Sequence, residues 1–327
     1  MSLSRGCRRK RSFSLSNHPP DKAILAQGLT KRFGTLTAVD HLDLEVVPGE
    51  AFALVGPDGA GKTTTMRLLT GIMEADAGQA RVLGFDTAGE TGPLKEHLGY
   101  MPQRFGLYDD LTVAENLAFY ADLHRVTREV RRKRGAELLE FANLAPFQSR
   151  LAAHLSGGMR QKLGLVCALI HTPQVLFLDE PTFGVDPISR REFWQILYQL
   201  LQTGITIFVS TAYMDEAERA HRVGLLDQGK LLAVDTPDAL KASFQGDLLE
   251  VRGPGLRAVR RLLAAQPLVL QTLARGDSLR LTVANREDAL PSLTAAFKEA
   301  GLQEMQITPA EPGLEDFFVQ LVSRQRE

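Results

Sequence analysis

Four short segments, in a fixed order along the chain, constrain the fold more than any other feature. Residues 56–63 (GPDGAGKT) come first, followed by residues 100–103 (YMPQ), 155–159 (LSGGM) and 176–180 (LFLDE). A continuous apolar run, residues 51–55, precedes the first segment, and a stretch with helical spacing and no helix breaker follows it. Strand, glycine-rich loop and helix in this order are the context in which such a loop binds phosphate. The order predicts an α/β fold with a phosphate site at the end of a strand.

The glycine-rich loop has the residue types that a phosphate site needs. Gly56, Gly59 and Gly61 leave backbone N–H groups free to surround phosphate oxygens, and the helix that starts near Lys62 adds the positive end of its dipole. Lys62 brings a full charge to the β- and γ-phosphates, and the Thr63 hydroxyl is a ligand for Mg²⁺. The predicted phosphate-binding residues are Gly56, Pro57, Asp58, Gly59, Ala60, Gly61, Lys62, Thr63 and Thr64.

Two adjacent carboxylates end another apolar run. Asp179 follows the apolar residues 176–178, and at the end of a buried strand its carboxylate can hold Mg²⁺ through water, as an Asp in that position does in P-loop enzymes. Glu180 follows immediately, before Pro181 and Thr182. A capped loop is the structural alternative for such a pair. The apolar run before it favours a site in which Asp179, with Thr63, holds the metal.

Apolar runs also predict the architecture around this site. Residues 51–55, 175–178 and 205–209 have the composition of buried strands, which indicates a largely parallel sheet. Thr112 and Glu115 form a capping box and predict a helix start. We interpret the arginine-rich stretch 125–134 as a solvated helix face, with partner docking as the alternative.

The character of the chain changes after residues 235–237, and we expect three parts. Residues 1–22 form a basic tail, 23–245 a nucleotide-binding domain and 247–327 a small ferredoxin-like α+β module. We interpret this module, which contains no cluster of metal ligands or nucleophiles, as a regulatory or dimer-stabilising appendage. Its expected elements are a strand at 248–252, a helix at 256–264, a hairpin turn at 275–277, a helix at 288–300, a strand at 302–307 and a helix at 314–322.

The bulk composition excludes some classes of protein. The chain has 327 residues, a net charge of −1 and two cysteines, so neither a disulfide framework nor a nucleic-acid partner is expected. No stretch approaches the roughly 20 apolar residues that cross a bilayer as a helix, so we expect any pore to belong to another chain. The basic start has no apolar region behind it, which indicates a disordered tail or a start codon assigned too early; weak attraction to anionic lipid is the alternative.

Together the four segments make the chain resemble the ATP-binding subunit of an ABC (ATP-binding cassette) transporter, over roughly residues 23–245. The resemblance implies a P-loop NTPase core with a largely parallel sheet and a helical signature subdomain. It implies that Glu180 is the catalytic carboxylate that polarises the attacking water, and that Gln103 reaches the metal. Phe33 matches the aromatic residue that stacks on adenine; an ordinary core position is the alternative. The cofactors implied are ATP and Mg²⁺.

Residues 155–159 match the family's signature. In the family Ser156, Gly157 and Gly158 contact the γ-phosphate held by a second nucleotide-binding domain, so a partner domain is implied, either a second copy or a different ATPase subunit. Asp186 matches the D-loop that crosses this interface.

Three positions depart from the family pattern. Asp58 replaces the usual Asn, Phe183 replaces a small residue, and Ala212 stands where the family has a His that senses the γ-phosphate. His221 lies too far along to substitute for that His. Two explanations stay open for Ala212: a slow site with compensation elsewhere, or an asymmetric pair in which this chain completes the active site of a different ATPase subunit.

The style of residues 99–108 resembles ATPase subunits of drug-efflux systems, whose partners are ABC-2-type permeases. We therefore expect a peripheral ATPase at the cytoplasmic face of the plasma (inner) membrane that energises export of drug-like or other small molecules. Soluble family members acting in translation or DNA maintenance are rivals, but residues 64–154 lack sustained heptads and only one nucleotide-binding domain is present. A GTPase is disfavoured because the chain has no Asn-Lys-x-Asp motif, which reads guanine. A regulatory subunit that binds ATP without hydrolysis is the remaining alternative.

Overall fold

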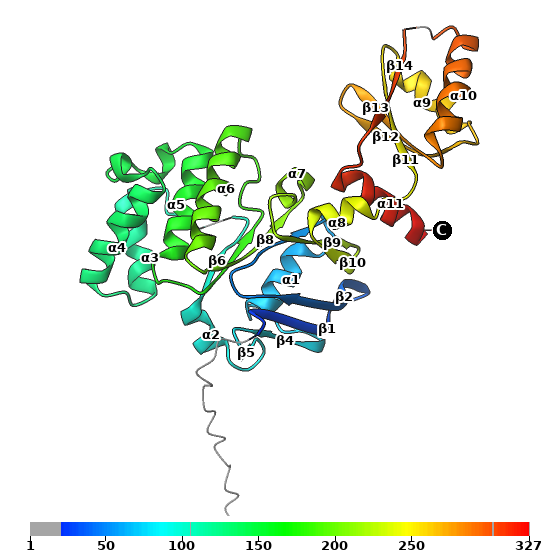
Figure 1. Ribbon diagram of the computed structural model, residues 1–327. Helices are drawn as coiled ribbons and strands as arrows, with labels where there is room; N and C mark the ends of the chain where they lie inside the picture. Colours follow the sequence, from blue (N-terminus) through cyan, green and yellow to red (C-terminus); the bar gives the residue numbers. More distant parts are fainter. Residues whose placement is uncertain (1–20, 105, 303, 327) are drawn as a thin grey trace, which may run out of the picture.

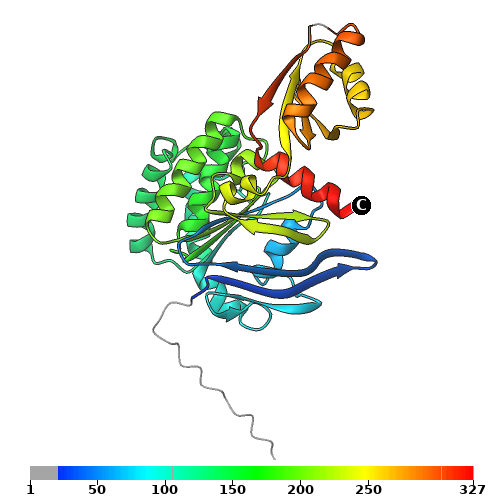
Figure 2. The ribbon, with the colours of Figure 1, turned by 45° about the vertical axis from the view of Figure 1, so that its right-hand side comes forward.

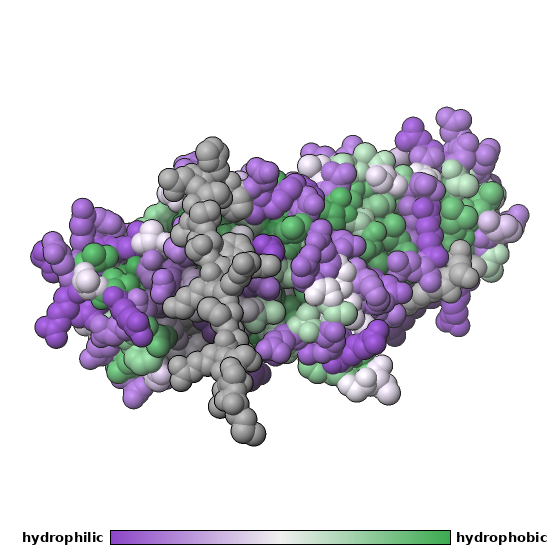
Figure 3. Space-filling view, turned by 90° about the horizontal axis from the view of Figure 1, so that it is seen from below, coloured by the Kyte–Doolittle hydropathy of each residue, from purple (hydrophilic) through white to green (hydrophobic). Residues whose placement is uncertain are grey.

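The computed structural model describes residues 21–104, 106–302 and 304–326. Three β-sheets organise this part of the chain (Figure 1). The expectation for the basic segment 1–22 lies, apart from Asp21 and Lys22, outside the described residues. Among the described residues, no helix combines the length and the apolar character needed to span a bilayer. Hydrophilic side chains extend across the width of the face shown in Figure 3.

The central sheet has the strand order β10-β9-β3-β8-β7-β6. All neighbouring strands pair in parallel except β10 with β9. Every residue of β3, β7 and β8 is buried, as expected for strands covered on both faces, so the predicted largely parallel sheet is confirmed. The strands are β3 (Ala51–Val55), β6 (Leu98–Met101), β7 (Val175–Asp179), β8 (Thr206–Thr211), β9 (Arg222–Asp227) and β10 (Lys230–Asp235).

Alternate residues of these strands enter two different cores, because successive side chains point to opposite faces of a sheet. Ala53 and Val55 of β3 pack in one core with Trp194, whereas Phe52 packs in the other with Phe208. The rings of Phe52 and Phe208 stack at 5.3 Å between centroids. The second core also receives the helix α1 (Lys62–Leu69) and an antiparallel sheet. That sheet consists of β1 (Ile24–Phe33), β2 (Leu36–Val46), β4 (Ala77–Val82) and β5 (Phe85–Asp86), in the order β2-β1-β4-β5.

Helices α3–α6 group together, away from strands β1, β2 and β4 (Figure 1). The predicted capping box is present: Thr112 accepts a hydrogen bond from the Glu115 N–H, and the Glu115 carboxylate accepts one from the Thr112 N–H at 2.8 Å. In α4 most of the basic residues are exposed, but Arg134 turns inward and donates two hydrogen bonds to the Leu169 carbonyl. The helices of this group are α3 (Val113–Leu123), α4 (Arg128–Phe141), α5 (Gly157–Leu169) and α6 (Pro187–Gln202), with short 3₁₀ turns at Ala145–Phe147 and Ala152–His154. The helix α2 (Thr91–His97) lies beside β5 and β6.

The C-terminal part has its own sheet, ordered β12-β13-β11-β14 with antiparallel pairing throughout. Residues of α9 and α10 pack with it around a separate apolar core. The chain order is βαββαβ, that of a split βαβ motif. These elements are β11 (Asp247–Arg252), α9 (Leu256–Ala264), β12 (Val269–Arg275), β13 (Ser278–Val283), α10 (Arg286–Glu299) and β14 (Gln306–Ala310).

One predicted strand in this part is displaced. We expected a strand at 302–307, but β14 begins at Gln306. Gly301 adopts a left-handed conformation (φ 70°) and the Leu302 N–H bonds back to the Phe297 carbonyl. The chain after α10 therefore ends the helix with a turn at the left-handed Gly301, and the first residues of the expected strand belong to this turn.

The last helix, α11 (Leu314–Arg326), returns to the part of the chain that contains the central sheet and lies between that part and the module (Figure 2). Leu314, Phe317 and Phe318 join the core that contains Trp194, next to α7 (Met214–Ala217) and α8 (Pro237–Ala242). On its other side Ser323 accepts a hydrogen bond from Gln271 of β12 at 2.8 Å. The helix therefore contacts both parts, and the division at residues 245–247 stays a prediction.

Candidate functional site

A cleft of about 680 Å³ lies where β3 and β7 end and the glycine-rich loop begins. Parallel strands bring their carboxyl ends to one edge of a sheet, so residues far apart in the sequence meet there. Most of the residues predicted to bind nucleotide line this cleft, together with several that were not predicted. The lining residues are Phe33, Leu36, Thr37, Ala38, Asp58, Gly59, Gly61, Lys62, Thr63, Thr64, Gln103, Glu180 and Gln228.

The glycine-rich loop requires glycine at two positions for different reasons. Gly61 has φ 108°, and a Cβ there would lie 2.3 Å from the Ala38 carbonyl oxygen. A Cβ on Gly56 would lie 2.1 Å from the Leu226 carbonyl oxygen. No side chain caps α1, so the N–H groups of its first turn face the cleft as donors for an anion.

The predicted residues Gly56, Pro57 and Ala60 do not line the cleft. The carbonyls of Gly56 and Pro57 accept hydrogen bonds from the Lys62 ammonium at 2.9 and 3.1 Å. Ala60 is buried, and its carbonyl accepts from the Gly229 N–H. These three residues contribute backbone contacts that hold the conformation of the loop, on the side away from the cleft.

A buried charge cluster occupies the floor of the cleft. Lys62 Nζ lies 3.0 Å from Glu180 Oε1, with side-chain exposures of 4% and 8%. Gln103 Nε2 donates to the other carboxylate oxygen of Glu180 at 2.8 Å. Glu180 itself has a left-handed backbone (φ 47°), a strained state for a non-glycine residue that is found most often at functional sites. Both the carbonyl and the hydroxyl of Ser210 accept from the Glu180 N–H at 3.1 Å and hold it there.

Asp179 lies beside this cluster with one oxygen satisfied and one free. Its Oδ1 accepts hydrogen bonds from the Ser210 hydroxyl at 2.6 Å and the Thr63 hydroxyl at 3.2 Å. Its Oδ2 is buried and has no hydrogen-bond partner in the described chain. Carboxylate and hydroxyl oxygens are the ligands that Mg²⁺ prefers. The donor set of Thr63 and Asp179 therefore fits this ion.

Phe33 lies at the end of β1 and is 47% exposed. The Lys31 ammonium is 5.7 Å from its ring centroid. The ring lines the cleft rather than a core, so the alternative of an ordinary core position is wrong. Its contact with adenine stays a prediction.

The signature residues Ser156, Gly157 and Gly158 do not line the cleft. Ser156 caps α5, and its hydroxyl accepts from the Met159 N–H at 3.3 Å. A Cβ on Gly158 would lie 2.7 Å from the Ser189 side chain, so this glycine permits α5 and α6 to pack closely. The structure does not bring these residues to Lys62 within one chain.

Asp186 caps α6 and accepts from the N–H groups of Ser189 at 3.0 Å and Ile188 at 3.1 Å. The Ser189 N–H, as the strongest influence, lowers the pKa of Asp186. Phe183 and Ile188 flank it and are 55% and 70% exposed. Two large apolar side chains are thus exposed next to the D-loop position.

Ala212 directly follows β8, whose last residue, Thr211, accepts a hydrogen bond from the Gly56 N–H at 3.4 Å. Position 212 is therefore next to the glycine-rich loop. His221 Nδ1 instead contacts the N–H of Ala51, at the opposite end of β3. His221 is not placed to replace the missing side chain.

Sequence reasoning missed the lining residues Leu36, Thr37, Ala38 and Gln228 and, beside the cleft, Ser210. Ser210 bonds both Asp179 and Glu180, and the only signal for it was a hydroxyl near the end of an apolar strand. Gln228 lines the cleft from the turn after β9, and no sequence pattern pointed to it.

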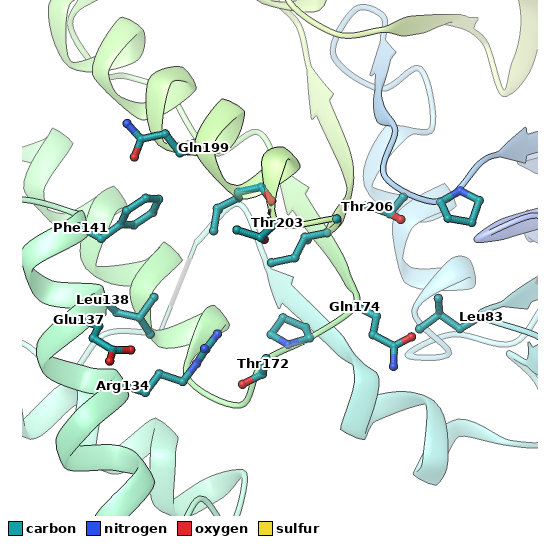
Figure 4. Close-up of a pocket in the computed structure, with 15 residues that line it drawn as sticks. Leu83, Arg134, Glu137, Leu138, Phe141, Thr172, Gln174, Gln199, Thr203 and Thr206 are labelled. Carbon is teal, nitrogen blue, oxygen red and sulfur yellow. Dashed lines mark hydrogen bonds between the residues drawn. The ribbon is translucent and has the colours of Figure 1, made fainter. Parts of the chain in front are cut away.

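Another cavity of about 620 Å³ lies away from this chemistry (Figure 4). Leu138 and Phe141 of α4, Leu200 of α6, and Thr206 at the start of β8 line it. It is therefore at the amino ends of the strands, opposite the glycine-rich loop. None of the predicted site residues lies there.

Comparison with known proteins agrees with this geometry. A family model described as "ABC transporter" matches residues 39–183. The daunorubicin resistance ATP-binding protein DrrA3 of Streptomyces coeruleorubidus is 36% identical over 311 residues, covering 94% of this chain and 98% of that protein. The chain belongs to the ABC transporter ATP-binding family. The Nod factor export ATP-binding protein I of Paraburkholderia xenovorans is 39% identical, with 94% and 99% covered.

The probable multidrug ABC transporter ATP-binding protein YbhF of Escherichia coli K12 is 46% identical over 92% of this chain, but the chain spans only about half, 52%, of that protein. Among solved structures, a dimeric ABC cassette bound to ADP and Pi matches with a TM-score of 0.59 and 26% identity, over 65% of this chain and 98% of that one. The predicted ABC ATPase core is confirmed. The fold of the C-terminal module stays a prediction.

Proposed function

We propose that this ABC protein binds Mg·ATP in the cleft, hydrolyses it, and thereby energises a separate ABC-2-type permease that exports small molecules. The observation that carries the proposal is the buried cluster of Lys62, Glu180 and Gln103 beside Asp179. Burying a charged pair is costly unless geometry and hydrogen bonds compensate. Here the Lys62–Glu180 pair lines the same cleft as the glycine-rich loop, where a bound phosphate would lie next to it.

Each residue then has a definite task. Lys62 and the open N–H groups of α1 bind phosphate oxygens, and Phe33 stacks on adenine. Thr63 and Asp179, with Gln103, would hold Mg²⁺, which supplies positive charge to the β- and γ-phosphates. Glu180, positioned by Gln103, accepts a hydrogen bond from the attacking water and orients it toward the γ-phosphate.

A second nucleotide-binding domain completes the site. Ser156–Gly158 lie outside the cleft of their own chain, and the exposed Phe183 and Ile188 border the D-loop position. Large exposed apolar groups favour an interface. We propose that ATP binding closes a head-to-tail pair, formed with a second copy or with a different ATPase subunit, and that hydrolysis reopens it.

Ala212 favours a second candidate, a partly degenerate subunit. An alanine cannot donate a hydrogen bond to the γ-phosphate or polarise Glu180, and loss of one such contact costs about 3 kcal/mol in the barrier. In this version the chain binds ATP and lends its signature residues to a different, fully equipped ATPase subunit.

Relatives named for drug resistance, multidrug transport and Nod factor export support an export role with drug-like or other small-molecule cargo. We place the protein at the cytoplasmic face of the plasma (inner) membrane, bound peripherally through its permease. The permease would hold the cargo contacts, and nucleic acid has no part in the proposal.

The test is the steady-state Mg·ATPase rate of the purified chain, alone and with candidate permease or ATPase subunits. Glu180→Gln keeps the shape of the side chain but removes its charge. We expect ATP hydrolysis by the wild type and a loss of on the order of 100-fold or more in this variant.

A silent chain that binds ATP, and whose addition activates a different ATPase subunit, would establish the degenerate alternative. A chain that neither binds ATP nor activates any subunit would refute both. Co-purification with an integral membrane protein tests the permease separately from the chemistry.

A further inference from the structure

Glu216, in the short helix α7, is a buried carboxylate outside the nucleotide cleft. Its side chain is 2% exposed, and burial raises its pKa. The two carboxylate oxygens have different partners. Oε1 accepts from the Thr182 hydroxyl at 2.5 Å, and Oε2 accepts from the Thr211 hydroxyl at 2.9 Å. One carboxylate therefore joins two segments that are distant in the sequence.

The first of these segments carries the catalytic candidate. Thr182 lies two residues after Glu180, and the turn is closed by hydrogen bonds from the Phe183 N–H to the Glu180 carbonyl and from the Val185 N–H to the Thr182 carbonyl, both 3.1 Å. The other segment, ending at Thr211, leads into Ala212. Glu216 thus fastens the turn after β7 to the end of β8.

Arg190 of α6 adds a third connection. Its guanidinium lies 3.9 Å from Glu216 Oε1, donates through Nε to the Val185 carbonyl at 3.1 Å, and covers the Tyr213 ring at 4.4 Å. Val185 immediately precedes Asp186. The cluster of Glu216 and Arg190 therefore contacts the turn after Glu180, the D-loop position and the segment of Ala212.

A buried carboxylate of this kind is expensive to maintain for stability alone. Its desolvation is offset by two hydroxyl donors and a guanidinium beyond normal hydrogen-bond distance, and an apolar residue of similar volume often stabilises such a position better. The neighbouring Asp215 is exposed. Of these two adjacent carboxylates, Glu216 is the one that is buried and bonded to Thr182 and Thr211.

We propose that Glu216 is a positioning residue for ATP hydrolysis: through Thr182 it holds the strained turn that carries Glu180 against the end of β8. This inference rests on the proposed function. Position 212 supplies no side-chain hydrogen bond to the site, so the orientation of Glu180 depends on this attachment from behind, together with Gln103 and Ser210.

The experiment compares Glu216→Gln and Thr182→Val with the wild type in steady-state Mg·ATPase assays of the full chain, with whichever partner subunit activity requires. We expect each to lower kcat about tenfold, the effect of losing one hydrogen bond to a charged group. The KM for ATP stays within about twofold because neither residue lines the cleft. The double variant falls no further than Thr182→Val alone, since both changes act on the same contact.

Two conservative variants separate positioning from folding. Thr182→Ser keeps the hydroxyl and retains the wild-type kcat, and Asp215→Asn changes an exposed carboxylate of the same helix without effect. A second readout needs no turnover: amide hydrogen exchange at Phe183 and Val185 accelerates in Glu216→Gln while ATP still binds.

The outcomes distinguish two failures. Wild-type kcat and unchanged exchange in Glu216→Gln would overturn this inference and leave the proposed function intact. A wild type no more active than Glu180→Gln under every partner condition would overturn hydrolysis by this site, and the exchange measurement would still decide whether Glu216 holds the turn.

Discussion

The ATPase region and the C-terminal module are built around different kinds of interior. The region near the cleft buries Lys62, Asp179, Glu180 and Glu216 together with several hydroxyls. In the module, Leu281, Phe297 and their neighbours form an apolar core, the buried polar residues of its described strands are the hydroxyl residues Ser278 and Thr282, and the buried carboxylate Asp316 lies on α11, where the two parts meet. Buried charge costs free energy that apolar packing does not. The comparison teaches that the ATPase region is organised around chemistry, whereas the module is organised around packing.

The largest expected effect is a loss of ATPase activity from an alanine substitution at Gly61, compared with the same substitution at a glycine of the module. Gly61→Ala places a Cβ 2.3 Å from a backbone oxygen at φ 108°, so the phosphate loop must shift. A displacement of about 1 Å in a catalytic group typically costs on the order of 100-fold, and we expect that loss in kcat/KM for ATP. Steady-state ATPase kinetics provide the measurement.

Gly276→Ala is the matched control in the module. Gly276 has φ 56° with no atom within 4 Å of a Cβ, so we expect only the left-handed strain of about 1–2 kcal/mol in the free energy of unfolding, with unchanged kinetics. Equal kinetic damage from both variants would erase the distinction between the regions.

The second prediction concerns the attachment of the module. Asp316 of α11 forms a buried ion pair with Arg280 of β13, with side-chain exposures of 3% and 14%. Asp316→Ala leaves the guanidinium buried and unpaired, which costs about 3–5 kcal/mol. We expect this loss in the unfolding transition of the module, which contributes to the far-UV circular dichroism of the whole chain but not to Trp194 fluorescence. The Trp194 fluorescence transition, which reports the ATPase region, shifts less.

Glu315→Ala serves as the control for this variant, because Glu315 is 46% exposed and its contact with Arg275 spans 3.9 Å. An exposed pair is worth at most about 1 kcal/mol. If both variants shift the two transitions equally, α11 does not connect two separately stabilised parts.

The smallest expected effect is a pH dependence confined to the ATPase region. Burial, followed by the charge of His124, lowers the pKa of His171 from 6.5 to about 4. Between pH 4 and 6.5 the unfolded chain therefore binds more protons than the folded chain. The contribution of the neutral His171 to the free energy of unfolding is complete above pH 6.5 and is lost as the pH falls toward 4. The sequence has no histidine after His221, so the module lacks this source of pH dependence.

Denaturation followed by Trp194 fluorescence at pH 7 and pH 5 measures this effect. His171→Gln reduces the loss of stability between these pH values, whereas His154→Gln, at an exposed position, leaves it unchanged. A wild-type loss that His171→Gln leaves intact would assign the pH dependence to other groups.

Local patterns were sufficient for much of the core. Continuous apolar runs predicted β3, β7 and β8, and the Thr112 capping box predicted the start of α3. These signals act within one strand or one helical turn, so neighbouring residues contain the information. The beginning of β14 was misplaced because the left-handed turn at Gly301 that closes α10 ties Leu302 back to the helix, so this apolar residue does not start the strand.

Contacts between distant segments were beyond such patterns. Ser210 bonds Asp179 across two strands, Arg134 turns inward from a mostly exposed basic helix face, and Glu216 joins Thr182 to Thr211. Each residue has an unremarkable sequence neighbourhood. Only the packing of β7, β8 and the helices decides which polar groups meet.

The sequence alone determined the family, the phosphate loop and the pair of carboxylates, because backbone geometry and strand ends place those groups through local interactions. Tertiary structure decided that Lys62 and Glu180 share one buried cluster, that Ser156–Gly158 lie outside their own cleft, and that α11 packs against the ATPase core. These outcomes depend on desolvation and on hydrogen bonds between segments many residues apart. Such terms exist only once the chain is folded.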